Sequence, residues 1–342
     1  MKLLPAFLLF LLAFLPLAEA RTITDAAGRK VDIPDRIEKV MAAGPPASVL
    51  VYVLAPEKLA GWVRAPGDAE KTYLMTAVRD LPVYGQLTGK GGTANIEAVL
   101  AAKPDLILDV GTVNATYASL ADKAQAQTGI PYVLIDGGFA GSAETLRKVG
   151  DILGVSERGE KLAIYAEGKL ADLKGKLAAI PADKRPRVYY GRGPEGLETG
   201  LSGSINLEIL EAAGAVNVAA SAGKGGLTQV SLEQILGWNP DTILAASGKF
   251  AASVKSDPLW ANVEAVKQSR VFVTPSLPFG WFDSPPGINR LIGIAWLEKL
   301  LYPDIFTADL SADVRDFYKL FYQVDLSDEQ LAALMKGSAQ VK

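Results

Sequence analysis

One stretch of the chain occurs twice, first as Asn95-Ile96-Glu97-Ala98-Val99-Leu100-Ala101-Ala102-Lys103-Pro104-Asp105-Leu106-Ile107-Leu108 and again as Ser231-Leu232-Glu233-Gln234-Ile235-Leu236-Gly237-Trp238-Asn239-Pro240-Asp241-Thr242-Ile243-Leu244. Each copy opens with Asn or Ser, which cap helix N-termini, and has a Glu two positions later, where the helix dipole favours a carboxylate. Apolar residues at the second, fifth and sixth positions predict a short amphipathic helix, which the Pro-Asp pair ends. The apolar run that follows predicts a buried parallel strand.

The spacing of the two copies predicts two lobes rather than a solenoid, because the copies lie about a domain's length apart. A chain of 342 residues also exceeds what one hydrophobic core usually organises. The alternative is that helix–Pro–Asp–strand is a common motif of α/β proteins and occurs twice here by chance. The Glu, Leu, Pro, Asp, Ile and Leu that match in register favour an α/β fold of two similar lobes.

A long helix is predicted between the two copies. Residues 156–180 carry apolar side chains at spacings of three and four, and Pro181 ends the pattern. About 25 residues at a rise of 1.5 Å span roughly 37 Å, which is enough to cross between two lobes. An ordinary surface helix is the alternative. The predicted division is a signal peptide at 1–20, a first α/β lobe at 21–155, a bridging helix at 156–181 and a second α/β lobe with C-terminal helices at 182–342.

The N-terminus has the pattern of a cleavable export signal. A positive start at Met1-Lys2 precedes an apolar run at Leu3–Leu17 and a small-x-small cleavage signal at Ala18-Glu19-Ala20. The apolar run is short for a membrane span and contains two prolines. We expect a mature chain that begins at Arg21 in the periplasm, and the absence of cysteine excludes lipid attachment.

Composition narrows the chemistry. The sequence has neither Cys nor His, which excludes thiol catalysis, zinc sites built on these residues, Ser-His-Asp triads and disulfides. A net charge of -3 gives no reason to expect nucleic acid or an anionic membrane surface as a partner. An enzyme that uses Asp, Glu, Lys or Tyr remains possible, but this composition disfavours one, and we expect no cofactor and no metal site.

Local patterns predict the remaining elements. A β-hairpin is expected where 22–25 and 30–33 flank Ala26-Ala27-Gly28-Arg29. Strands are expected at 37–42, 58–63, 132–135, 187–190 and 271–273, and helices at 49–54, 143–153, 205–213, 289–301, 312–321 and 328–336. Ser48 is expected to cap the first of these helices. That strand–loop–helix junction is the kind of place where open α/β sheets bind ligands.

Two glycine-rich segments point weakly to nucleotides. Gly191-Arg192-Gly193-Pro194-Glu195-Gly196 matches G-x-G-x-x-G after a strand, but the dinucleotide fingerprint needs a helix that opens within the glycines. Here Pro194 intervenes, and the next helix is expected only near Ile205. The segment 85–91 lacks the Ser or Thr that follows Lys in a phosphate loop. Neither segment supports a nucleotide site.

Several motifs in order along the chain resemble one family. They are the Thr-Asp-Ala-Ala-Gly-Arg hairpin after a signal peptide, Gly91-Gly92 before the first Glu-bearing copy, Ile205-Asn206-Leu207 before Ala212-Ala213-Gly214-Ala215, Phe317-Tyr318 with Phe321-Tyr322, and Leu326-Ser327-Asp328-Glu329-Gln330. Together they are similar to the helical-backbone periplasmic binding proteins of iron-siderophore, haem and corrinoid importers. The resemblance covers nearly the whole mature chain.

The resemblance implies two lobes joined by one rigid helix, with a ligand cleft between them. It implies that a Glu on each lobe, here Glu97 and Glu233, docks on Arg residues of an inner-membrane ABC permease; the alternative is that both are ordinary acids of a first helical turn. A monomer is expected. The implied cargo is a ferric chelate or a similar metal complex, and a molybdate-type oxyanion, haem and a corrinoid remain open.

Candidate ligand contacts combine arginines, which suit carboxylate or oxyanion groups, with aromatic rings, which suit flat apolar or cationic faces. Core packing or solvated surface positions are the alternatives for the aromatic residues and the arginines. The candidates are Pro45, Pro46, Ser48, Arg64, Tyr84 and Asn114 from the first lobe, and Arg192, Thr199, Phe279, Trp281 and Phe282 from the second. A rival function is an exported hydrolase that uses Glu195 and Glu198 with Asp283 as paired carboxylates.

Overall fold

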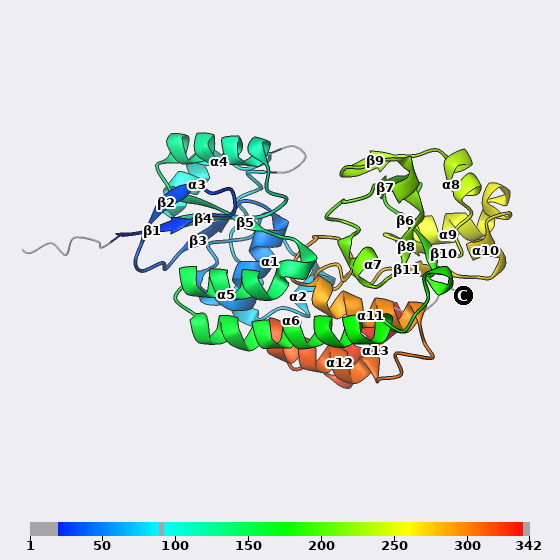
Figure 1. Ribbon diagram of the computed structural model, residues 1–342. Helices are drawn as coiled ribbons and strands as arrows, with labels where there is room; N and C mark the ends of the chain where they lie inside the picture. Colours follow the sequence, from blue (N-terminus) through cyan, green and yellow to red (C-terminus); the bar gives the residue numbers. More distant parts are fainter. Residues whose placement is uncertain (1–19, 89–91, 338–342) are drawn as a thin grey trace, which may run out of the picture.

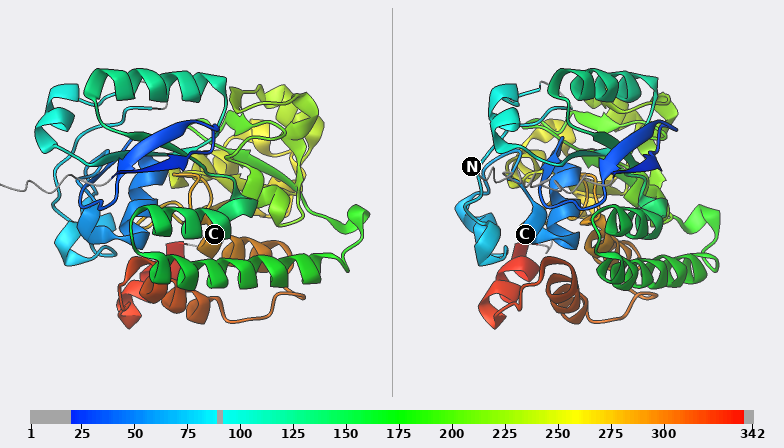
Figure 2. Two further views of the ribbon diagram at one scale, coloured as in Figure 1. Left: turned by 60° about the vertical axis from the view of Figure 1, so that its left-hand side comes forward. Right: turned by 90° about the vertical axis from the view of Figure 1, so that its left-hand side faces the viewer.

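Two parallel sheets form the cores of two lobes that lie side by side above one long helix (Figure 1). The computed structural model describes residues 20–88 and 92–337, so most of the predicted signal peptide lies outside the described residues. The two further views show the long helix beneath both lobes (Figure 2). No helix in the described part of the chain is long and apolar enough to cross a membrane.

The first lobe contains a hairpin and a three-stranded parallel sheet of order β3-β4-β5. Its elements are β1 (Ala20–Thr24), β2 (Lys30–Pro34), β3 (Val40–Ala42), α1 (Pro45–Leu54), η1 (Pro56–Lys58), α2 (Asp68–Lys71), η2 (Thr76–Val78), α3 (Ile96–Ala102), β4 (Leu106–Gly111), α4 (Ala115–Thr128), β5 (Tyr132–Asp136), η3 (Phe139–Gly141) and α5 (Ser142–Ile152). All three sheet strands are buried over most of their length, as expected for a parallel sheet covered on both faces.

The second lobe is built on a four-stranded parallel sheet of order β11-β10-β6-β8, with a small antiparallel pair β7-β9 at the top. Its elements are β6 (Arg187–Gly191), β7 (Glu198–Gly200), α7 (Glu208–Ala212), β8 (Val216–Asn217), η5 (Val218–Ala222), β9 (Leu227–Gln229), α8 (Leu232–Trp238), β10 (Thr242–Ala245), α9 (Gly248–Ser256), η6 (Pro258–Trp260), α10 (Glu264–Lys267) and β11 (Val271–Val273). The linking and C-terminal elements are α6 (Ser156–Leu177), η4 (Ala182–Lys184), α11 (Arg290–Leu301), α12 (Leu310–Phe317), a π-helical turn η7 (Tyr318–Tyr322) and α13 (Asp328–Gly337).

The two copies of the repeat are structurally equivalent. Asn95 and Ser231 cap α3 and α8, and each helix ends in a left-handed residue directly before Pro-Asp, Lys103 with φ 48° and Asn239 with φ 46°. The Asp of each copy then ties its strand to the neighbour. The Oδ2 atom of Asp105 accepts from the Lys39 N–H at 2.8 Å, and that of Asp241 accepts from the Arg187 N–H at 2.9 Å. The repeat therefore builds the same helix–strand unit in both lobes.

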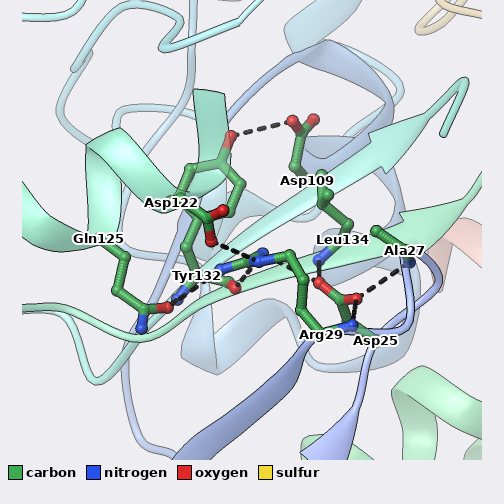
Figure 3. A network of polar contacts seen from close by, with 8 residues as sticks. All are labelled: Asp25, Ala27, Arg29, Asp109, Asp122, Gln125, Tyr132 and Leu134. Atoms are coloured by element: carbon green, nitrogen blue, oxygen red, sulfur yellow. Dashed lines mark hydrogen bonds and ion pairs between the residues drawn. The ribbon is translucent and has the colours of Figure 1, made fainter. Parts of the chain in front are cut away.

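A buried ion pair holds the N-terminal hairpin to the first sheet (Figure 3). Arg29 donates to Asp25 at 2.9 Å, to Asp122 at 2.8 Å and to the Tyr132 carbonyl at 3.2 Å. The Asp25 carboxylate also accepts the Leu134 N–H at 3.3 Å. Because the Asp25 side chain is fully buried and receives several donors, removing Arg29 would leave a costly unpaired charge.

Helix α6 has 22 residues and spans about 33 Å. It is slightly shorter than predicted, since residues 178–180 lie beyond its end. Near its start it crosses α5 at two glycines: a Cβ on Gly159 would lie 2.8 Å from the Leu146 oxygen, and one on Gly150 would lie 3.0 Å from the Gly159 Cα. Near its other end, Leu177 packs against Gly214 of the second lobe. The helix thus contacts both lobes and is fastened most closely to the first.

The C-terminal helices return to the first lobe. Tyr52 of α1 donates its hydroxyl hydrogen to the Tyr322 carbonyl at 2.6 Å, and Arg158 of α6 donates to the Leu320 carbonyl at 3.1 Å. Gln330 of α13 donates to the Thr72 carbonyl at 2.9 Å. These contacts join the end of the chain to the first lobe and to α6. The predicted lobe boundaries remain predictions.

Three predicted elements are wrong in detail. Ser48 does not cap the first helix, because α1 begins at Pro45 with Gly44 as its cap; proline is favoured at the first helical position, where no N–H is needed. Residues 58–63 form only isolated bridges at Leu59 and Trp62 in place of a strand. The helix expected at 205–213 is confined to Glu208–Ala212.

Candidate ligand-binding cleft

A cleft of ≈ 860 Å³ lies between the two lobes and is lined by residues of both. A side cavity of ≈ 310 Å³ shares part of the same lining, including Pro45, Pro46 and Asn206. The Asp109 carboxylate borders this side cavity, where it accepts from the Tyr132 hydroxyl at 2.9 Å (Figure 3). Burial raises the pKa of Asp109. The cleft occupies the edge where the carboxyl ends of parallel strands from both sheets meet, the usual ligand position in open α/β sheets.

The first-lobe wall is dominated by the start of α1. Pro45 and Pro46 occupy its first two helical positions and face the cleft. Neither proline has an N–H, so this helix end offers fewer donors to an anion than an ordinary helix N-terminus does. Ser48 lies one turn further along and borders the cleft, and its buried hydroxyl has no hydrogen-bond partner in the described structure.

A guanidinium–carboxylate pair completes the first-lobe wall. Arg64 donates two hydrogen bonds to Glu70, at 2.8 Å and 2.6 Å, and both residues border the cleft. Glu70 also accepts the Gly67 N–H at 2.8 Å, which fixes the carboxylate at the start of α2. The hydrogen bonds that Arg64 donates to Glu70 raise the pKa of Arg64. The positive charge of Arg64 is therefore compensated within the wall.

The second-lobe wall contains a buried polar cluster around Asp283. The Arg192 Nε donates to Asp283 at 2.8 Å, the Tyr190 hydroxyl donates at 3.3 Å, and the Asn206 amide donates to the other carboxylate oxygen. Burial raises the pKa of Asp283, and the charge of Arg192 opposes that rise. The buried Nη1 of Arg192 makes no hydrogen bond with a described residue and lies 3.7 Å from Glu198 Oε1. Asp283 thus holds the guanidinium at the cleft while leaving donors unused.

Polar contacts near the cleft also join the lobes to each other. Arg290 of α11 is buried and donates to the Gly137 carbonyl of the first lobe at 2.8 Å and to the Ile205 carbonyl of the second at 2.7 Å. Glu208 of the second lobe accepts the Phe139 N–H of the first at 2.8 Å. Burial lowers the pKa of Arg290 to about 10. These contacts restrict the relative movement of the lobes.

The structure brings most of the predicted ligand contacts to the cleft and leaves four elsewhere. Those that border it are Pro45, Pro46, Ser48, Arg64, Asn114, Arg192 and Phe279. The Asn114 oxygen is already used as the cap of α4, where it accepts two backbone N–H groups. Their roles toward a ligand remain predictions.

The four residues that do not border the cleft are packed into the lobes. Trp281 is fully buried and donates to the Leu277 carbonyl at 3.2 Å, and the Phe282 ring packs 4.3 Å from that of Tyr190. Thr199 is fully buried in β7. Tyr84 packs against Gly61 and the core of the first lobe. Core packing is the better interpretation of these four side chains.

Several cleft residues were not predicted as ligand contacts. Trp62, Glu70 and Asn206 border the cleft, and Asp283 appeared only in the rival hydrolase. The rival's carboxylates do not form a pair over the cleft, because Asp283 is bound to Arg192 and Glu195 is exposed away from the lining. In the described part of the chain, no group of three acidic residues is placed to hold a metal ion.

The two carboxylates of the repeat lie outside the cleft. Glu97 and Glu233 are both exposed in the first turns of α3 and α8. Figure 1 shows these helices on the same upper side of the molecule, one on each lobe, opposite the long helix.

A family model described as periplasmic binding protein matches residues 50–278. This chain belongs to that family. The molybdate-binding protein MolA of Haemophilus influenzae is 31% identical over 97% of this chain and 99% of its own length. An ABC transporter solute binding protein from Sulfurospirillum deleyianum has a similar structure, with a TM-score of 0.82, 30% identity and coverage of 92% of this chain and 99% of that one. The structure of MolA bound to molybdate has a TM-score of 0.74 at 28% identity, covering 90% of this chain and 99% of that one.

These relatives are binding proteins, and the periplasmic binding protein described here is likewise a solute-binding protein of the ABC-transporter type, not an enzyme. Its fold is the two-lobed α/β arrangement of that family, as the sequence predicted. Membership in this family implies that the protein is exported from the cytoplasm. The cleavable signal peptide and the monomeric state stay predictions.

Proposed function

We propose that this periplasmic binding protein captures a metal complex of an organic chelator, with a ferric chelate as the leading candidate. The complex would bind between the lobes and be delivered to an inner-membrane ABC permease. The size and lining of the cleft carry the proposal. A volume of ≈ 860 Å³ falls within the range of about 300–1,000 Å³ that is usual for drug-sized ligands and far exceeds what one small oxyanion fills.

The lining of the cleft supports a ligand with both apolar and oxygen-rich faces. Prolines and aromatic side chains, including Pro46, Trp62 and Phe279, supply apolar surface. Arg64 and Arg192 supply directional N–H donors for ligand oxygens, while Glu70 and Asp283 compensate their charge. A chelate with hydroxamate or carboxylate oxygens around its metal fits this combination of donors with little net charge.

The second candidate is an oxyanion of the molybdate class. It is favoured by the similarity to MolA of Haemophilus influenzae, which extends over nearly the full length of both chains. The Ser48 hydroxyl and the Arg192 Nη1, which make no hydrogen bond with a described residue, are donors that such an anion would use. Other relatives are a cobalamin-binding protein of Halobacterium salinarum, 27% identical over 74% of this chain and 66% of its own length, and the Fe(3+)-citrate-binding protein YfmC of Bacillus subtilis, 27% identical over 54% and 58%.

Calorimetric titration of the purified mature protein tests the proposal. The probes are ferric citrate, a ferric tris-hydroxamate, haemin, cobalamin and molybdate, each followed by a thermal shift. A ligand at about a hundred times its dissociation constant stabilises the protein by roughly 2.7 kcal/mol. We expect the tightest binding for a ferric chelate. Binding of molybdate alone would select the second candidate, and failure of every probe would overturn the cargo assignment.

Docking on the permease is the second part of the proposal. Glu97 and Glu233 occupy equivalent exposed positions on the two lobes, so both carboxylates can reach a two-fold partner at the same time. We propose that each pairs with an arginine of the permease. We further propose that the protein acts as a monomer after cleavage of residues 1–20, because one molecule already presents both docking sites.

A further inference from the structure

Helices α3 and α8 carry the two carboxylates proposed to dock on the permease, and we call them the docking helices. Each has a partly exposed leucine near its carboxylate. Leu100 of α3 is 41% exposed, and Leu236 of α8 is 37% exposed. They occupy the same position in the two copies of the repeat, three residues after Glu97 and Glu233. Residues three apart lie on the same face of a helix, so the carboxylate and the leucine point outward together.

The exposure pattern around these leucines is the same in both helices. The preceding residues, Val99 and Ile235, are buried completely and anchor the opposite helix face. The following residues, Ala101 and Gly237, are exposed and have a short side chain or none, so they do not cover the leucine. Each helix therefore presents an exposed glutamate, a partly exposed leucine and a small exposed residue, in the same order along the chain.

A single exposed leucine is ordinary on a soluble protein and needs no explanation. Here, eight large apolar side chains are exposed in the described chain, and two of them fall at the same point of a repeat whose copies share only part of their sequence. Both also stand next to an exposed acid. The repeat gives the two leucines equivalent positions, and a partner with two equivalent sites would contact both.

We propose that Leu100 and Leu236 are the apolar anchors of the surface that Glu97 and Glu233 share, and that the permease presents a cation beside an apolar recess at each of two symmetric places. This inference rests on the proposed docking function. Exposed ion pairs guide association and orientation but add little to affinity, because water and salt screen them. A leucine that enters a recess loses its contact with water and slows dissociation.

The test is the binding kinetics of the ligand-loaded protein on the importer's own permease–ATPase complex in lipid nanodiscs. Leu100→Ala with Leu236→Ala should raise the dissociation rate about tenfold or more, with an unchanged salt dependence of association. Glu97→Gln with Glu233→Gln should instead slow association and flatten its salt dependence. The matched control is Leu120→Ala with Leu259→Ala, two leucines exposed by 42% and 63% outside the docking helices. Circular dichroism melting checks that all variants remain folded.

The outcomes separate the inference from the function on which it rests. A wild-type protein that does not bind the complex at any salt concentration removes the permease as partner and overturns both. Wild-type binding that depends on the two glutamates but not on the two leucines overturns the inference alone. An effect from one leucine and none from the other contradicts the symmetric arrangement, since each single variant should contribute a comparable part.

Discussion

The surfaces of the two lobes that carry α3 and α8, here called the outer faces, are alike. The surfaces that line the cleft, here called the inner faces, differ. On the outside, α3 and α8 share a cap, an exposed glutamate, an exposed leucine and a left-handed end before Pro-Asp. On the inside, the first lobe offers the proline-rich start of α1 and an exposed ion pair, whereas the second offers the buried cluster of Arg192, Asp283 and Asn206.

This difference separates two demands on the fold. A two-fold membrane partner would select for equivalence between the outer faces, because both must fit the same kind of site. A ligand without such symmetry would select for different donors on the two walls. The repeat therefore predicts the partner's symmetry, and the walls predict the ligand's chemistry.

The largest effect is expected when the matching glutamates are removed from the outer faces of both lobes. Glu97→Ala with Glu233→Ala should abolish transport into reconstituted vesicles, because linked contacts reinforce each other and neither lobe would then be held. Removing an exposed helix-end acid costs only about 0.3–1 kcal/mol, so the melting temperature should stay near that of the wild type. The measurement is transport rate beside ligand affinity. Undiminished transport, or an equal loss of ligand binding, would mean that the repeat is only an element of the fold.

A smaller effect is expected from changing the second-lobe wall. Arg192→Ala removes charge-assisted hydrogen bonds, each of which contributes about 1.5–3 kcal/mol, so ligand affinity should fall roughly 10- to 100-fold or more. The variant should also lose stability, since the buried Asp283 would keep no cation. The control is Arg192→Ala with Asp283→Asn, which should regain stability but not affinity. Affinity that returns with stability would show that Arg192 supports the wall without contacting the ligand.

Glu298 lies on neither the outer nor the inner faces of the lobes. Replacing it should therefore change the stability of the protein but not its ligand affinity. Burial raises its pKa to about 7, while Lys169 and Lys176 of α6 lower it and Asp172 and Asp313 raise it. The folded state therefore prefers the protonated acid, and the stability that this provides is lost as pH rises from about 4.5 through 7.

Glu298→Gln should consequently stabilise the protein at pH 8 and make no difference near pH 4.5. We expect a gain on the order of 1 kcal/mol, reduced by the partial exposure of the group. The measurement is urea unfolding of variant and wild type at both pH values. A constant difference between the two pH values would contradict the titration, and altered ligand affinity would place Glu298 closer to the cleft than the structure does.

The two caps should differ slightly. Ser231 forms a full capping box with Gln234, whereas Asn95 accepts one N–H and has no partner of that kind. Replacing either by alanine should cost about 1 kcal/mol, with Ser231→Ala the larger loss by a few tenths. Thermal unfolding of the two single variants gives the comparison. Equal losses would mean that the second half of the box contributes nothing measurable.

The smallest effect is expected on overall shape. The inter-lobe contacts of Arg290 and Glu208, together with α6, leave little freedom for hinge closure. X-ray scattering profiles of the free and ligand-bound protein should almost superimpose. A large contraction on binding would contradict the rigid bridge.

The outer faces were predictable from the sequence because their signals are local. Cap, carboxylate, proline and aspartate all fall within one short stretch, and each acts on its immediate neighbours. The start of α1 was predicted less well, because Pro45 and Ser48 are both compatible with a helix start and only the backbone path decides between them.

The second-lobe wall was the hardest to predict. Trp281, Phe282 and Asp283 are consecutive, and the first two pack into the core while the third binds Arg192, which is far away in the sequence. Nothing within the local window indicates which side chain faces which way, because the direction depends on Tyr190 and α11 packing against the loop. Of the three aromatic residues predicted from this proline- and glycine-rich loop, Phe279 borders the cleft, whereas Trp281 and Phe282 pack into the core.

The glycine contact between α5 and α6 makes a small rotation at one end of the long helix a larger displacement at its other end. Because Gly150 and Gly159 bring the two backbones almost into contact, the start of α6 moves with the first lobe as one body. A rotation of the first lobe by about 5° around that crossing would therefore carry the far end of α6, roughly 27 Å from Gly159, through roughly 2 Å. That displacement is less than one layer of water, so a tilt of this size would leave the outline of the molecule almost unchanged.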